Sequence, residues 1–147
     1  MKKNKTQSFS LIEVLVFISI LSIFFVAAAS VTVVSLRNMK INEHKILATH
    51  YAEELLGWLR NEKETDWNTF VQNSNNTYCF HETPISDWGG LGSCDVDDKL
   101  AIIFKRELVL SHVGGSPTQI NVKITVSWSD TGIDYSVPLS TVLTVWE

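Results

Sequence analysis

The first half of this 147-residue chain has almost none of the residues that interrupt helices. The first glycine is Gly57 and the first proline is Pro84. Charged side chains are also missing from residues 14–36, a run of 23 positions. Because glycine and proline weaken helices and charge opposes burial in lipid, these absences permit one long helix whose first part is apolar.

Basic residues are scarce in the second half. From Asp66 onward the chain has ten acidic side chains against four basic ones, a balance of −6. Binding to phosphates needs a basic patch, so we expect no nucleic-acid binding by this part. Serine nucleophile elbows and phosphate-cradling glycine loops are absent too, since residues 89–92 lack the strand and helix that such loops join. We therefore expect a protein that is not an enzyme and needs no cofactor.

The uncharged run 14–36 has the length of a membrane span. As a helix it would extend about 35 Å, which covers the ~30 Å hydrocarbon core of a bilayer. Its serine and threonine hydroxyls can bond back to carbonyls of their own helix and are therefore tolerated in lipid. A buried helix of a soluble protein is the alternative, but the length favours a span.

Helical spacing continues beyond this run, but the pattern becomes amphipathic. Charged residues such as Glu53, Glu54 and Arg60 occupy one side. The apolar stripe on the other side comprises Ile41, Leu47, Ala48, Tyr51, Ala52, Leu55, Trp58 and Leu59. We expect one helix of which residues 9–36 lie in the membrane or a filament core and residues 37–64 pack on a globular head.

Residues 65–100 show no sustained period and mix polar residues with aromatic ones such as Trp67 and Trp88. We expect an irregular loop whose underside these rings bury. Cys79 and Cys94 are separated by 14 residues, which fits neither a zinc knuckle nor a redox pair. Outside the cytoplasm they would form a disulfide that staples the loop; two free thiols are the alternative.

Residues 101–147 have the pattern of an antiparallel sheet. Apolar and polar residues alternate strictly over 120–129, which predicts a strand with one buried face. Residues 101–110 precede it as a second strand, and residues 133–145 follow with their apolar residues on one parity. Pro138 indicates an edge position or a bulge. The expected fold class is α+β, a long helix packed on an antiparallel meander of three to four strands.

Glu13 stands directly before the apolar run. A carboxylate at the border of a membrane span is unfavourable unless it has a partner. If the chain were cut between Ser8 and Phe9, the new α-amine would lie four residues before Glu13, within reach in the same subunit or in a neighbouring one. Low dielectric would strengthen such a pair. The alternative is that Glu13 extends to the lipid headgroups.

The N-terminus resembles that of type IV pilins and pseudopilins, the class III signal. The resemblance covers about the first 40 residues. It is carried by the basic leader with Lys2, Lys3 and Lys5, by the sequence Ser-Phe-Ser-Leu-Ile-Glu-Val-Leu-Val at 8–16, and by the apolar run that follows. It implies a pilin-like fold with a retained N-terminal helix.

The resemblance also implies a maturation route. A prepilin peptidase would remove the leader, residues 1–8, by cleavage between Ser8 and Phe9, and Phe9 would be N-methylated. The helix would hold the subunit in the inner membrane as a single pass, with the head outside the cytoplasm. Glu13 would neutralise the Phe9 amine of a neighbour when an inner-membrane assembly platform packs it with other pilin or pseudopilin subunits.

Three features depart from the usual pattern of this family. Ser8 stands where most members have glycine, the anchor contains no proline, and the cysteine pair lies between helix and sheet instead of near the C-terminus. The short leader and small size are more similar to minor pilins or minor pseudopilins of the V and I types than to a major subunit. The resemblance does not distinguish a pilus, a type II secretion-like filament and a DNA-uptake filament.

Two other functions stay open at this level. A pilin-like anchor could carry an adhesive module whose loop 66–99 recognises a ligand, or the chain could be an uncleaved single-pass membrane protein. Asp95, Asp97 and Asp98 are weak calcium candidates, because an EF-hand's glycine and later glutamate are missing. His44, His50, His81 and His112 belong to no metal-binding spacing.

Overall fold

The computed structural model describes residues 10–145 and divides the chain into two units. We call residues 10–42 the N-terminal unit and residues 43–145 the head unit. Helix α1, Leu11–Thr65, begins in the first unit and ends in the second. The long N-terminal helix expected from the sequence is therefore confirmed.

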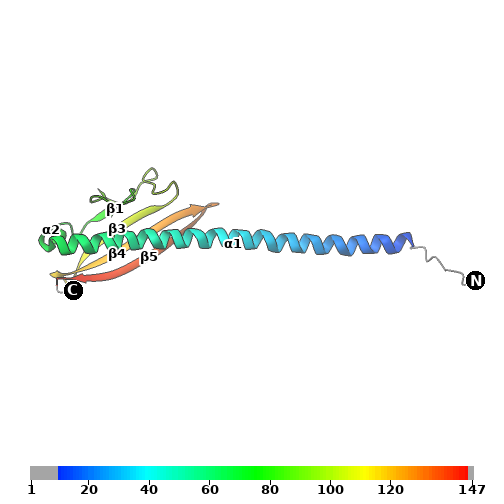
Figure 1. Cartoon of the computed structure of the whole chain (residues 1–147), viewed down its shortest axis with the longest axis horizontal. Helices are drawn as coiled ribbons and strands as arrows, with labels where there is room; N and C mark the ends of the chain where they lie inside the picture. Colours follow the sequence, from blue (N-terminus) through cyan, green and yellow to red (C-terminus); the bar gives the residue numbers. More distant parts are fainter. Residues whose placement is uncertain (1–9, 146–147) are drawn as a thin grey trace, which may run out of the picture. The chain divides into compact units, whose positions relative to one another are not determined.

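The head unit combines the second part of α1 with a short helix and one antiparallel sheet (Figure 1). The strand order is β2-β1-β3-β4-β5, so the last three strands form a meander. The elements after α1 are α2 (Trp67–Gln72), β1 (Thr77–Cys79), β2 (Gly90–Leu91), β3 (Lys105–Val113), β4 (Ser116–Asp130) and β5 (Ile133–Thr144). The α+β, pilin-like fold class is confirmed.

Most of the apolar stripe of α1 packs on one face of the sheet, but Leu47, which the sequence pattern placed in that stripe, is exposed. Ala48, Ala52, Leu55 and Leu59 are all fully buried, and they recur at steps of four, three and four residues as one face of a helix requires. The sheet contributes every second residue of its strands to the same core. Its buried members include Leu108, Leu110, Ile120, Val122, Ile124, Val126 and Leu143.

The alternation predicted for residues 120–129 is present in β4, and β5 is an edge strand as Pro138 indicated. Pro138 pairs with Thr125 in the register of the two strands. An edge strand tolerates proline because a missing N–H on its outer side breaks no ladder bond. Both predictions are confirmed.

The sheet has five strands, more than the three to four that the sequence predicted. The additional strands β1 and β2 come from the segment expected to be an irregular loop, and they have only three and two residues. β1 pairs with β3, with Tyr78 opposite Leu108, and its other side pairs with β2. Strands this short show no alternation in sequence, so their pairing depends on contacts with distant segments.

β3 begins at Lys105 and not at Ala101. Ala101 and Ile102 have φ angles of 47° and 78°, in the left-handed region, which a strand cannot contain. Leu100 and Phe104 form a bridge across this turn, each donating its N–H to the carbonyl of the other. The turn therefore precedes the strand.

Helix α2 also lies within the segment expected to be irregular. Asp66 is its N-cap, and its carboxylate accepts hydrogen bonds from the backbone N–H of Asn68 and the hydroxyl of Thr69. These bonds, that from the Thr69 hydroxyl above all, hold the pKa of the Asp66 carboxyl below its ordinary value. The cap starts α2 only one residue after α1 ends.

Candidate functional site

The N-terminal unit is a helix that exposes its apolar side chains on all sides. Every residue from 11 to 36 is exposed, with Phe17, Phe24 and Phe25 each more than 60% exposed. Within residues 10–145, α1 is the one helix long and apolar enough to cross a membrane. A helix that is apolar all round needs lipid or other helices around it.

Hydroxyl groups in this segment bond to their own helix, as the sequence predicted. Ser19, Ser22 and Ser30 donate to the carbonyls four residues earlier, at 2.8 to 2.9 Å. Thr32 does the same at 3.0 Å. These bonds satisfy the donors without water, which makes the segment compatible with lipid.

Glu13 lies in the first turn of α1. Its backbone N–H donates to the carbonyl of Ser10 at 3.0 Å, so the residue is already helical. The N-terminal end of a helix dipole favours a negative charge at this position. The two other residues of the expected processing and pairing site, Ser8 and Phe9, lie outside the described residues, so cleavage, methylation and the Phe9–Glu13 pair stay predictions.

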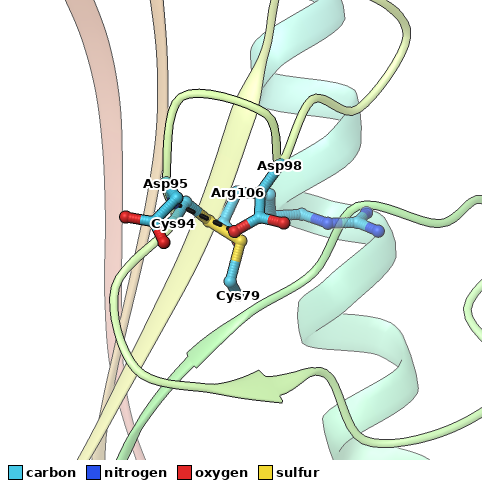
Figure 2. Close-up of a disulfide and its surroundings, with 5 residues drawn as sticks. All are labelled: Cys79, Cys94, Asp95, Asp98 and Arg106. Carbon is cyan, nitrogen blue, oxygen red and sulfur yellow. Dashed lines mark hydrogen bonds between the residues drawn. A yellow bond between two sulfur atoms is a disulfide. The ribbon is translucent and has the colours of Figure 1, made fainter.

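Cys79 and Cys94 form a disulfide, with Cα atoms 5.0 Å apart (Figure 2). Cys79 ends β1 and is buried, whereas Cys94 lies in the loop after β2. The bond closes a loop of 15 residues in sequence separation, for which the chain-entropy model gives a stabilisation of about 3 kcal/mol. The disulfide reading is confirmed over that of two free thiols.

Arg106 lies beside the disulfide and extends toward α1 (Figure 2). Its side chain is fully buried, and its guanidinium donates to the Glu54 carboxylate at 2.8 Å. It also donates to the carbonyls of Tyr51 and Glu82, at 3.1 and 2.6 Å. One side chain therefore joins the helix, the sheet and the loop closed by the disulfide.

Burial lowers the pKa of the Arg106 guanidinium, and the hydrogen bond that the guanidinium donates to the Glu54 carboxylate opposes that shift. The sequence pattern does not single out this residue, and it predicts Glu54 among the solvent-facing charges. The alternation along β3 could have identified Arg106 as buried, because this residue lies on the same face as Phe104 and Leu108, which are buried. A cation at a core position requires an anion and polar acceptors nearby.

The three aspartates considered for calcium form a turn. The carboxylate of Asp98 accepts the backbone N–H of Asp95 at 3.0 Å (Figure 2), and Asp95 and Asp97 are exposed. Throughout residues 10–145, no group of three or more histidine, cysteine, aspartate or glutamate side chains is arranged to hold a metal ion.

His112 forms a structural contact with the segment after α2. Its Nε2 lies 2.5 Å from the hydroxyl of Ser74, and its backbone N–H donates to the Asn75 side chain. Ser74 is 7% exposed and its hydroxyl also bonds to the Val71 carbonyl. The pair therefore ties the segment after α2 to β3.

The aromatic residues of segment 65–100 pack together, as the sequence predicted. Trp88 lies within 5.1 Å of the rings of Trp58 and Tyr78 and within 6.1 Å of Phe70. Trp67 contacts Phe70 at 5.8 Å. These contacts bury the underside of the segment against the end of α1.

Residues 3–29 match the family model described as the prokaryotic N-terminal methylation motif. No curated protein and no solved structure matches the chain. The match confirms the resemblance of the N-terminus to the class III signal and is consistent with the type IV pilin and pseudopilin family. The remainder of the chain has only its fold, disulfide and buried ion pair to indicate its role.

Proposed function

We propose that this chain, which carries a prokaryotic N-terminal methylation motif and an exposed apolar helix, is a structural subunit of a type IV pilus or type II secretion-like filament. The single observation that carries the proposal is that the methylation motif and the exposed apolar helix occur together at the N-terminus. The motif supports a pilin-like or pseudopilin-like prepilin substrate, and the helix that begins within it at Leu11 exposes every residue from 11 to 36.

Within this proposal, residues 1–8 are the leader and residues 9–36 the segment that lies first in the inner membrane and then in the filament core. A prepilin peptidase cleaves after Ser8 and methylates Phe9. The Glu13 carboxylate pairs with the methylated amine of a neighbouring subunit, since a carboxylate in an apolar helix bundle requires a compensating charge. Size and the proline-free anchor favour a minor pilin or a minor pseudopilin of the V or I type.

Mass spectrometry of the chain extracted from membranes tests the processing step. Co-expression with a prepilin peptidase is expected to yield a chain that begins at methylated Phe9. A chain that still begins at Met1 would contradict the proposal and favour an uncleaved single-pass membrane protein. A Ser8→Gly variant serves as the matched control, because glycine is the usual residue before the cut and makes the same site a standard substrate.

Glu13→Ala tests the pairing step. We expect cleavage and membrane insertion to be retained and incorporation into filaments to be strongly reduced, because the variant removes the charge and keeps the apolar helix. Immunodetection in sheared filament fractions measures incorporation. Ser19→Ala, a change on the same helix that removes only a local hydroxyl bond, is the control. Incorporation of Glu13→Ala at the level of Ser19→Ala would exclude the charge pair.

A further inference from the structure

One end of the head unit can be recognised from ring contacts. The ring of His44, near the start of this unit, lies 5.9 Å from that of Phe104 and 6.2 Å from that of Trp128. Further along β3, Arg106 bonds to Tyr51. β3 and α1 therefore run in the same direction, and β4, being antiparallel, runs back.

This direction places two turns at the end where the chain enters the head unit. The turn at 101–103 immediately precedes Phe104, and the turn at 131–132 follows Trp128 by three residues. We call this region, with His44, the entry end. The other end of the sheet contains α2 and the turn between β3 and β4.

Exposed aliphatic side chains gather at the entry end. Seven large aliphatic residues of the described head unit are exposed, by 37% to 83%. Two lie elsewhere, Leu91 in β2 and Val142 in β5. The other five lie at the entry end. Ile46 and Leu47 follow His44 in α1, Val96 and Ile102 line the groove described below, and Ile133 begins β5. Such a concentration, unlike scattered exposed residues, marks an interaction surface.

Ile102 is the most unusual member of this group. Its side chain is 83% exposed and its φ angle is 78°, a backbone conformation that β-branched residues rarely adopt. Leu100 and Phe104, both buried, close the turn through two hydrogen bonds. The surrounding structure therefore holds an apolar side chain outward against a local cost, which is typical of functional positions.

A groove of about 540 Å³ lies beside Ile102. Val96 contributes a second exposed aliphatic side chain to its rim, and Lys99 and Lys105 contribute amines. Asp134 also lines the groove, and Asp95, Asp97, Asp98 and Asp130 lie on the adjoining segments. Acidic groups thus outnumber the lysines, so the surface would not be drawn to a strongly anionic partner. An uncharged or zwitterionic surface fits it better.

The peptide chain limits how far the entry end lies from the anchor. Leu36 ends the uncharged run and His44 follows eight residues later (44 − 36). Eight residues span about 12 Å as a helix and no more than about 29 Å when fully extended. The headgroup layer itself extends about 5–7 Å beyond the hydrocarbon on each side. His44 therefore lies within about 29 Å of the end of the uncharged run, whatever the arrangement of the two units.

We propose that the entry end lies on the zwitterionic headgroup layer of the membrane while the subunit is anchored there, with Ile102 and Val96 as the side chains that enter it. This inference rests on the proposed function, since it requires the N-terminal unit to be in the membrane. Lipid contact buries the exposed aliphatic groups, and the lysine amines can reach headgroup phosphates. Extraction into a filament then has to break this contact.

Depth-dependent quenching of a fluorophore tests the proposal. Single cysteines would be introduced as Ile102→Cys, Leu91→Cys and Ser22→Cys in the full chain, labelled with an environment-sensitive dye without reductant, and reconstituted in phosphatidylcholine nanodiscs with one chain per disc. Leu91 is the matched control, because it is an exposed aliphatic residue of similar exposure, 75%, away from the entry end. Position 22 reports whether the anchor is in the bilayer. The quenchers are two spin-labelled lipids, one with its label near the headgroup for positions 102 and 91 and one with its label on the acyl chain for position 22.

We expect the dyes at 22 and 102 to be shifted to the blue and to lose emission to the spin-labelled lipids, while the dye at 91 does neither. Quenching at 22 with equal behaviour at 102 and 91 would overturn the inference and leave the proposed function intact. No quenching at any position would overturn both. Discs that hold two or more chains are prepared as a comparison. If the shift at 102 occurs only in those discs, a second copy of the chain, and not the lipid, covers this side chain, and the inference is overturned.

Discussion

The buried ion pair gives the sharpest test of how the head unit is held together. In Glu54→Ala, the Arg106 guanidinium loses its carboxylate while its side chain stays fully buried. Breaking a buried pair by removing one partner costs about 3–5 kcal/mol. The Tyr51 and Glu82 carbonyls still accept from Arg106, and the Glu54 side chain is 24% exposed, so water partly compensates. We therefore expect a loss of about 3 kcal/mol in the free energy of unfolding, the lower end of that range.

Urea unfolding of the full chain in detergent, followed by tryptophan fluorescence, measures this loss. With a slope of about 2 kcal/mol per M, the midpoint would fall by about 1.5 M. Glu53→Ala is the matched control, since Glu53 is the exposed neighbour on the same helix and its removal should change stability by no more than about 0.5 kcal/mol. Glu54→Ala combined with Arg106→Met should recover part of the loss, because no unpaired charge remains buried. A midpoint for Glu54→Ala equal to that of Glu53→Ala would refute the reasoning.

Two further outcomes follow from the loop and the second helix. Replacing both cysteines, as Cys79→Ala with Cys94→Ala, should lower the free energy of unfolding by about 3 kcal/mol, and reductant should lower the midpoint of the native chain but not that of the variant; equal reductant sensitivity would contradict a stabilising disulfide. The Asp66 pKa is lower in the folded chain than its ordinary value of 3.8, so the stability that this carboxylate contributes is present above that pH and is lost as pH falls through the folded pKa. Acid titration of fluorescence near Trp67 should therefore show a transition below pH 3.8 that Asp66→Asn lacks, and an identical titration of the two chains would count against the cap.

The long helix and the meander could be predicted because each depends on a local pattern. Residues 41–59 repeat with helical spacing, and residues 120–129 alternate, so each element shows which face it buries before any partner is known. The N-terminal motif is local as well, since leader charge, first aromatic residue, glutamate and apolar run are consecutive. The family model matches this same stretch.

β1, β2 and α2 were missed for the opposite reason. The strands have three and two residues, and they exist because β1 adds to the free edge of β3 and the disulfide fixes its end. Helix α2 has six residues and depends on the Asp66 cap. Elements this short gain their stability from distant contacts and caps and not from their own propensity.

By itself the sequence determined the membrane-length helix, the α+β class and the N-terminal motif, because periodicity, length and order along the chain are properties of consecutive residues. Only the tertiary structure decided which charges matter inside the head. Glu54 and Arg106 are 52 positions apart, and their pairing follows from α1 lying over β3. The clustering of exposed aliphatic residues around His44 likewise depends on which turns the antiparallel strands bring to one end of the sheet. Tertiary packing decides both the ion pair and this clustering, because it brings together residues that are far apart in sequence and that no local pattern links.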